Sequence, residues 1–436
     1  MKTKMLRLSL GAMLMVPVAS MAEVTDEQMS ALEARIAQLE AEGSGGASAD
    51  AGGFGKVKVN GFMSAGFGRA ELDDFSYDNG LDEEWSHKAD AVVGLQLDAQ
   101  VNDRTSAVVQ LVGRGPENFD VSAEWAYIGY RPTAQDEVRA GRLRSTFFMM
   151  SEYLEVGYAY PWARPPAEVY RSGLPSSFEG LYWRHSFSGG DWTHESQLTW
   201  GSTKSPSGST TPIRADSAAG IGLNSSSGNW QLSAKYSQAD LTGSNSLLDA
   251  LVLFGMAEPL EDSRIRYAAL GAQYDNGSLL VMAEATRVDI DGTFADTAQA
   301  YLTVGYHLGK FLPHVTFASS GVSDKDERPI NPGIPALCAG FGVCLPDGAM
   351  NGTLDGNPDP FPADTLQRLL ESEQDSVTLG LRYDFLPNAA IKADWTHVLD
   401  TYDSFGLFAR DDGNVFYGAG PGDGIDIFRV VVDVVF

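Results

Sequence analysis

An alternation of apolar and polar side chains recurs through residues 56–436 and limits what this chain can fold into. It is clearest in the last segment, FRVVVDVVF, which ends on an aromatic residue. In an extended strand, successive side chains point to opposite faces. One face of this segment is then wholly apolar and the other carries both charges: Phe428, Val430, Val432, Val434 and Phe436 against Arg429, Val431, Asp433 and Val435. An apolar face this complete at a chain end indicates an apolar surrounding.

About sixteen segments alternate in this way, and each is close to the roughly 9 to 11 residues that a tilted strand needs to cross a bilayer. The first three are centred on 57–67, 91–99 and 107–111, and the others lie near 121–130, 137–144, 179–187, 192–200, 217–224, 230–237, 264–274, 278–288, 298–308, 311–319, 376–384, 389–397 and 425–436.

The connections between these segments alternate between short turns, such as 386–388, and long loops, such as 145–178 and 320–375. A transmembrane barrel has short turns at one end and long loops at the other, whereas a soluble sandwich has no reason for this asymmetry. After the N-terminal leader, the sequence contains no apolar run of the roughly 18 residues that a spanning helix needs. The sequence therefore predicts an all-β protein, a 16-stranded antiparallel transmembrane β-barrel.

The first 55 residues differ from the rest. Residues 1–22 predict a cleaved signal peptide, because three basic residues precede an apolar run too short to span a bilayer and small residues follow it. Residues 23–41 have apolar side chains at helical spacing, which predicts a short amphipathic or coiled-coil helix. Residues 42–55 are a Gly, Ser and Ala linker, and residues 56–436 form the barrel domain.

The chain is acidic, with a formal net charge of -27. This balance argues against nucleic acid as a partner, because the phosphate backbone would be repelled. Much of the acidity falls in predicted loops, at 73–74, 82–84, 324–327 and 371–375. An acidic mouth of this kind would attract cations, including divalent ions that bridge lipid phosphates.

These features together resemble the Gram-negative outer-membrane porins. The phrases AEWAYIGYRP, EVRAGRLR, SVTLGLRYDFLPNAAIKADWTHV and FRVVVDVVF are similar to phrases of that family, and the likeness covers residues 56–436. It implies a homotrimer of barrels in the cell outer membrane, each with a water-filled channel and an inward-folded third loop. It also implies a terminal strand that the outer-membrane assembly machinery recognises. The other expected partners are outer-membrane lipid, lipopolysaccharide, and the small hydrophilic solutes and ions that diffuse through.

A channel of this kind is selective through its width and its electric field. The predicted third loop, 145–178, contains the carboxylates of Glu152, Glu155 and Glu168, and we expect them to face cations of the barrel wall. The wall cations predicted to line the pore are Arg114, Arg142, Arg144, Arg184, Arg382 and Lys392, with Lys235, Arg266 and Arg429 also inward by parity. Facing rows of opposite charge would create a transverse field. The alternative is that these charges pair with one another and hold the loop to the wall.

Other functions remain open at this point. A solute-selective channel, for example one that prefers anions, would use the same basic wall. A barrel enzyme or an adhesin is a weaker alternative, because no catalytic motif marks the sequence, and we expect no enzyme activity, cofactor or metal. The six histidines show no metal-ligand spacing. Cys338 and Cys344 lie close together in a predicted loop, where a local disulfide is favoured over half of a zinc site.

Overall fold

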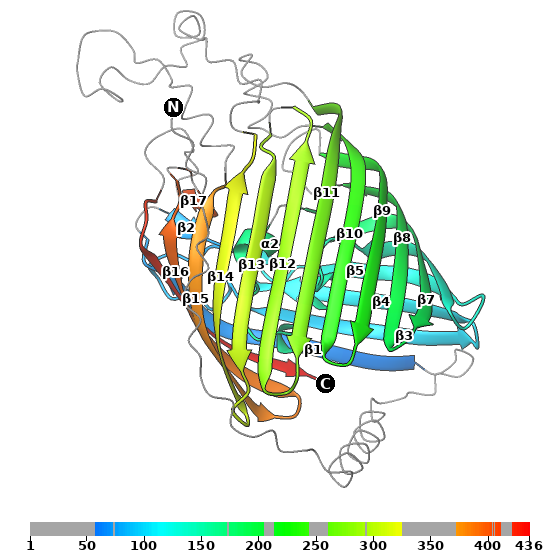
Figure 1. Cartoon of the computed structure of the whole chain (residues 1–436), viewed down its shortest axis with the longest axis horizontal. Helices are drawn as coiled ribbons and strands as arrows, with labels where there is room; N and C mark the ends of the chain where they lie inside the picture. Colours follow the sequence, from blue (N-terminus) through cyan, green and yellow to red (C-terminus); the bar gives the residue numbers. More distant parts are fainter. Residues whose placement is uncertain are drawn as a thin grey trace, which may run out of the picture. The chain divides into compact units, whose positions relative to one another are not determined.

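Sixteen strands close into one antiparallel barrel in which each strand pairs with its neighbours along the chain (Figure 1). The computed structural model describes residues 57–72, 75–171, 174–204, 213–243, 260–292, 294–324, 372–402, 404, 406–410 and 421–436. The predicted signal peptide, helix and linker lie outside these residues, as do Cys338 and Cys344. The predicted all-β, 16-stranded architecture is confirmed.

The barrel strands follow the predicted segments closely. Their bounds are β1 Val57–Ala70, β3 Val92–Asn102, β4 Thr105–Arg114, β5 Val121–Tyr130, β6 Asp136–Arg144, β7 Ser177–Gly189, β8 Trp192–Lys204, β9 Arg214–Ser227, β10 Trp230–Gly243, β11 Leu260–Asp275, β12 Leu279–Ile290, β13 Thr297–Tyr306, β14 Phe311–Val322, β15 Gln374–Leu386, β16 Ala389–Asp400 and β18 Ile425–Val435. Short turns such as 103–104 and 387–388 lie at one end, here the turn end; longer connections such as 71–91 and 145–176 lie at the other, the loop end.

The barrel closes where the last strand meets the first. β18 pairs antiparallel with β1 from Phe62↔Val435 to Ala70↔Ile427. Beyond the strand, the Gly61 amide donates to the Phe436 carbonyl at 2.7 Å, and the Phe436 amide donates back to Gly61 at 2.9 Å. The ladder therefore extends to the last residue. These backbone hydrogen bonds continue the seam to Phe436 and leave no strand edge unpaired there.

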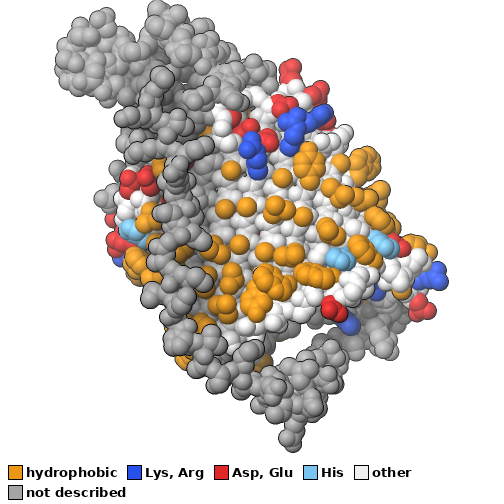
Figure 2. Space-filling model, in the orientation of Figure 1, with side chains coloured by type: hydrophobic (Ala, Val, Ile, Leu, Met, Phe, Trp, Pro, Cys, Tyr) orange, Lys and Arg blue, Asp and Glu red, His pale blue; other side chains and the backbone are white. Residues whose placement is uncertain are grey.

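The two faces of β18 are sorted as its sequence predicts. Val430 and Val432 are 39% and 36% exposed on the outer face, while Val431 and Asp433 are each 1% exposed on the inner face. Across the strands in view, hydrophobic side chains cover the middle of the outer surface and charged ones gather at its ends (Figure 2). This is the distribution expected of a barrel in contact with lipid. Among the described residues, no helix is both long and apolar enough to cross a membrane.

Tryptophan and histidine share an aspartate at each end of the outer face. Toward the loop end, Asp426 accepts the Trp395 indole N–H at 2.9 Å and lies 2.7 Å from His397 Nδ1. Toward the turn end, Asp136 makes the same two contacts with Trp183 and His185. Amphipathic rings prefer the boundary between lipid and water. These two clusters therefore mark the upper and lower limits of the apolar band.

Two loops at the loop end pack together above the seam. β2 (Phe75–Tyr77) and β17 (Phe408–Arg410) form a separate two-stranded sheet. Tyr77 is 2% exposed within a cluster of apolar side chains that also includes Ile425 and Ile427 of β18. These loop segments are thereby fixed to the wall beside β18.

Replacing Leu270 by Arg tests the assignment of the outer face. Leu270 is 68% exposed on β11, so an arginine there would meet hydrocarbon and destabilise the folded barrel by about 2–4 kcal/mol. Gln231→Arg, on the inner face of the neighbouring strand β10, should cost less than about 1 kcal/mol because the side chain stays in water. Urea titrations of folding into lipid vesicles measure both values. Equal costs for the two variants would contradict the assignment.

Candidate functional site

The third loop, residues 145–176, lies inside the barrel. It leaves β6 and returns to β7 through short turns η2 (Ser151–Tyr153), η3 (Gly157–Ala159) and α2 (Ala167–Tyr170). The Tyr158 hydroxyl donates to the carbonyl of Pro387, in a turn at the opposite end of the barrel, at 2.7 Å. The loop therefore reaches deep into the lumen, and the predicted inward fold is confirmed.

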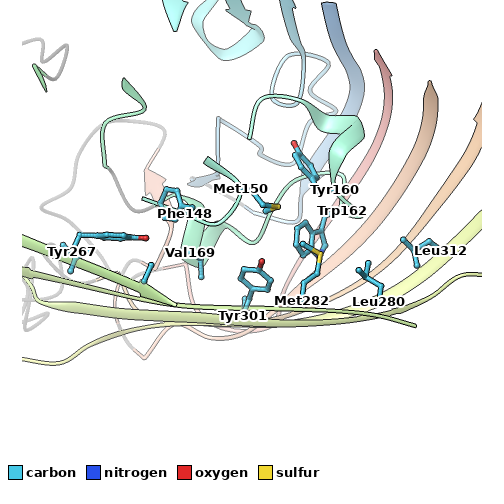
Figure 3. Close-up of a cluster of buried hydrophobic side chains, with 13 residues drawn as sticks. Phe148, Met150, Tyr160, Trp162, Val169, Tyr267, Leu280, Met282, Tyr301 and Leu312 are labelled. Atoms are coloured by element: carbon cyan, nitrogen blue, oxygen red, sulfur yellow. The ribbon is translucent and has the colours of Figure 1, made fainter. Parts of the chain in front are cut away.

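Apolar side chains seal one side of this loop against the wall. Phe148, Met150, Tyr160, Trp162 and Val169 of the loop pack with residues of β11 to β14 (Figure 3). At the centre, the Trp162 indole donates to Thr303 at 3.2 Å and to Thr316 at 2.8 Å. On this side the loop packs directly against β11–β14 through buried apolar side chains.

A buried ion pair latches the middle of the loop. Lys392 on β16 and Asp433 on β18 lie 2.9 Å apart, with side chains 0% and 1% exposed. Lys392 also donates to the Gly157 carbonyl, and Asp433 accepts from the Ser64 hydroxyl at 2.5 Å. A Cβ on Gly157 would overlap the Asp433 carboxylate and the Ser64 hydroxyl, so only glycine permits this approach.

The loop backbone finds further partners on β15 and β16. Arg382 donates to the carbonyls of Tyr158 and Tyr160 at 2.7 and 3.0 Å. The carboxylate of Asp394 accepts the Ala163 amide at 2.7 Å. A buried backbone without such partners would be strongly destabilised. Arg382 and Lys392, predicted to line the pore, therefore hold the loop to the wall.

A second cluster of charges joins the start of the loop to β4, β5 and β6. Arg114 lies 2.7 Å from Glu124 and 2.8 Å from Glu155, and Arg144 bridges the same two carboxylates at 3.1 and 3.2 Å. Burial alone raises the pKa of Glu155, but Arg144 and Arg114 outweigh it and hold that pKa down to about 2. This carboxylate therefore stays ionised at any ordinary pH. Arg114, Arg144 and Glu155 do meet, as expected for a loop facing the wall.

Glu168 pairs with no cation among the residues that the structure describes. Its carboxylate accepts from Ser376 at 2.6 Å and from Gln374 at 2.7 Å, and its side chain is buried. Burial raises the pKa of Glu168 above its ordinary value. The hydrogen bonds from Ser376, its own backbone and Gln374 oppose this shift without cancelling it. The predicted pairing of this residue with a basic wall is not seen.

Arg142 does not face the lumen, which corrects the prediction. The register pairs it with Ala126 and Glu179 on the outer face, and its guanidinium binds the Glu179 carboxylate. Arg144 shares that parity, but β6 ends there, so its side chain turns into the barrel toward the Ser151 carbonyl. Arg266 is also outward, because it shares a face with exposed Leu270.

Arg184 lies on the inner wall within a chain of alternating charges that the prediction missed. Arg139 and Arg184 both bind Glu137, at 3.1 and 2.6 Å, and Arg184 reaches Glu195 at 3.2 Å. The Arg139 guanidinium also lies between the rings of Tyr127 and Tyr182, 5.1 and 5.0 Å from their centroids. The sequence did contain a signal for these residues. The alternation of side chains along β6 and β8 places Arg139, Glu137 and Glu195 on the inner face.

Open space remains on the side of the loop that faces β7 to β10. A cavity of about 360 Å³ there is lined by polar side chains, among them Glu195, Ser233 and Lys235 of the wall and Glu152 of the loop. Lys235 donates to the Phe148 carbonyl at 3.0 Å. Glu152 is exposed and has no hydrogen bond or ion pair with any described residue. A water path through the lumen would run here.

The described residues therefore do not form the predicted rows of free charges facing one another. The inner cations Arg114, Arg144, Arg184, Arg382 and Lys392 all bind carboxylates or backbone carbonyls. The alternative, that such charges pair and hold the loop to the wall, describes four of them; Arg184 pairs within the wall. Over the described ranges, no three His, Cys, Asp or Glu side chains come together in a group that could hold a metal ion.

Comparison with known proteins supports the architecture. No protein-family model and no curated protein matches the chain. Among solved structures, OmpF of Salmonella typhi, in complex with daunomycin, aligns with a TM-score of 0.54 at 12% identity, over 88% of this chain and 98% of that chain. The fold is a porin fold.

Two further porin-like structures agree. The outer-membrane channel DcaP of Acinetobacter baumannii aligns with a TM-score of 0.52 at 12% identity, over 90% of this chain and 99% of that chain. An anion-selective porin from Comamonas acidovorans aligns with a TM-score of 0.51 at 14% identity, over 87% and 99%. At identities of 12–14%, these alignments establish the fold alone.

Replacing Lys392 by Met tests the latch. The substitution leaves the Asp433 carboxylate buried without its cation, which should destabilise the protein by about 3–5 kcal/mol. In the double variant Lys392→Met, Asp433→Asn no unpaired charge remains, so most of that stability should return. Chemical denaturation in detergent measures both. A single variant as stable as the parent would show that the pair does not hold the loop.

Proposed function

We propose that this protein is an outer-membrane channel for the passive diffusion of small hydrophilic solutes and ions. The observation that carries the proposal is the division of the lumen by the third loop. One side of the loop is sealed by the cluster around Trp162, and the other faces a polar cavity lined by β7 to β10. A closed barrel with apolar outer and partly hydrated inner faces supplies both an anchor in lipid and a path for water.

The wall of this path favours passive diffusion over tight binding. On the wall beside this path, the charged residues Arg139, Glu137, Arg184 and Glu195 already satisfy one another. A site that held a solute tightly would need polar groups free to exchange those contacts. A solute-selective channel is the second candidate, and the fold shared with the anion-selective porin from Comamonas acidovorans makes anions the solutes to test first.

The finer predictions belong to the same proposal. Export by a cleaved signal peptide (1–22) and recognition of the terminal strand by the assembly machinery would bring the chain to the outer membrane, among lipid and lipopolysaccharide. A homotrimer is supported by one solved structure of this fold, the trimer form of Vibrio cholerae OmpT. The helix predicted at 23–41 would add a contact between protomers if it forms a coiled coil.

Single-channel recording in planar bilayers tests the proposal. The purified full chain should conduct with a linear current–voltage relation, and its conductance should rise in proportion to KCl concentration. Current that saturates with one solute would favour the selective channel instead. An absence of current, with the protein folded and inserted, would contradict both and favour a structural barrel or an enzyme.

A further inference from the structure

We propose that the open side of the lumen holds a weak binding site for amino acids with an apolar side chain. The inference rests on the proposed channel function and names a class of solute that the same path retains briefly as it passes. It follows from an apolar pocket that adjoins the polar cavity beside the loop, and from a buried lysine where the two meet.

The apolar pocket has a volume of about 80 Å³ and lies at the loop end of this side of the lumen. At about 10–15 Å³ for each water-sized group, it has room for about five to eight such groups, enough for a branched alkyl chain or a single ring. The two ends of the third loop and strands β7 to β11 form its walls, with Phe147, Leu174, Phe178, Ala239, Ile265 and Tyr267 among the lining residues. An apolar group that displaces water from such a surface is stabilised there.

The pocket adjoins the polar cavity of about 360 Å³. Three segments of the chain pass from the cavity to the pocket within two residues: Gln197 to Thr199 on β8, Lys235 to Ser237 on β10, and Met149 to Phe147 in the loop. Two residues of an extended strand span about 7 Å. A single small molecule can therefore place its polar end in the cavity and its apolar end in the pocket.

Lys235 marks the place of a carboxylate in this cavity. It is 8% exposed, and its ammonium donates to the Phe148 carbonyl at 3.0 Å. An ammonium has three N–H donors, and the other two have no acceptor among the residues that the structure describes. None of the described carboxylates forms an ion pair with it. A buried ammonium is stabilised by an anionic partner, which the carboxylate of a bound solute supplies.

Carboxylates that line the same cavity favour a solute with a positive charge as well. Glu152 of the loop and Glu195 of β8 lie around the cavity together with Lys235. These two groups repel a simple carboxylic acid, whereas they attract the ammonium of an amino acid. An amino acid such as leucine therefore matches the pocket through its side chain and the cavity through both of its charges.

Block of the KCl current by free amino acids tests the site. In planar bilayers that hold the full-length protein, L-leucine should reduce the current half-maximally at a concentration about tenfold lower than glycine does, because only leucine buries a side chain in the pocket. Leucine and glycine carry the same charges, so a difference between them reports on the pocket. 3-Methylbutylamine, which is leucine without its carboxylate, should also bind more weakly than leucine.

Ala239→Leu fills the pocket from β10, where Ala239 is 8% exposed. In this variant the half-blocking concentrations of leucine and glycine should become nearly equal. Ala234→Leu is the matched control, because it makes the same substitution on the same strand but on the outer face. Ala234 lies opposite Leu270, which is 68% exposed. The control should keep the parental difference between leucine and glycine.

Lys235→Met tests the lysine separately. It should raise the half-blocking concentration of leucine about tenfold, the effect of losing one hydrogen bond to a charged group. It should not weaken the binding of 3-methylbutylamine, which has no carboxylate to lose. Equal weakening of both probes, or an amine that blocks the parent as well as leucine does, would overturn the role of Lys235.

The outcomes separate this site from the channel function. Conducting channels in which leucine and glycine act at the same concentration, or in which Ala239→Leu keeps their difference, would overturn the site and leave the channel function intact. Parent protein that inserts without conducting would remove the channel function itself.

Discussion

In lipid, every backbone N–H and C=O must find its partner within the protein, and the rest of this structure depends on that constraint. The chain meets it by closing sixteen strands on themselves and pairing Phe436 with Gly61 at the seam. Once the ribbon is closed, period-two alternation sorts side chains between lipid and lumen. The same sorting explains why the chain can end on an apolar strand.

A closed barrel of this size leaves a lumen too wide for wall side chains to fill. The third loop fills part of it, and the loop's own polar backbone then needs partners. Arg382, Lys392 and Asp394 supply them, so much of the charge inside the barrel serves attachment. The loop's apolar residues fill one side of the lumen, where they pack against the wall. The part of the lumen that this packing does not fill remains open to water.

The sequence was sufficient for the strands because their alternation is a local property. The same alternation was misleading about which side chains of β11 face inward. On the inner face of this strand, Tyr267 packs against the loop and is 2% exposed. Wherever the loop covers the wall, the inner face is also apolar, so apolar character no longer marks the outside. Arg266 was placed on the wrong face in that region.

Charge pairing was beyond the reach of sequence for a different reason. Glu155 and Arg114 are 41 residues apart, and nothing in either segment specifies the partner. Residues at strand ends add a further uncertainty, because Arg144 turns inward while Arg142, with the same parity, stays outside. The sequence identified Glu152, Glu155 and Glu168 as loop carboxylates, but only the fold shows that Glu152 alone of the three lacks a described partner.

The central claim is that the third loop lies against the inner wall, and a disulfide between them tests it most directly. The Met149 Cβ lies 3.1 Å from where a Cβ on Gly271 would stand, close to the separation of about 3.5–4.5 Å in a disulfide. In a chain with Cys338 and Cys344 replaced by Ser, the pair Met149→Cys, Gly271→Cys should oxidise to a disulfide detectable by mass spectrometry. Met149→Cys with the outward Leu270→Cys should remain reduced. Free thiols in the first pair, in folded protein, would place the loop outside the lumen and contradict the account.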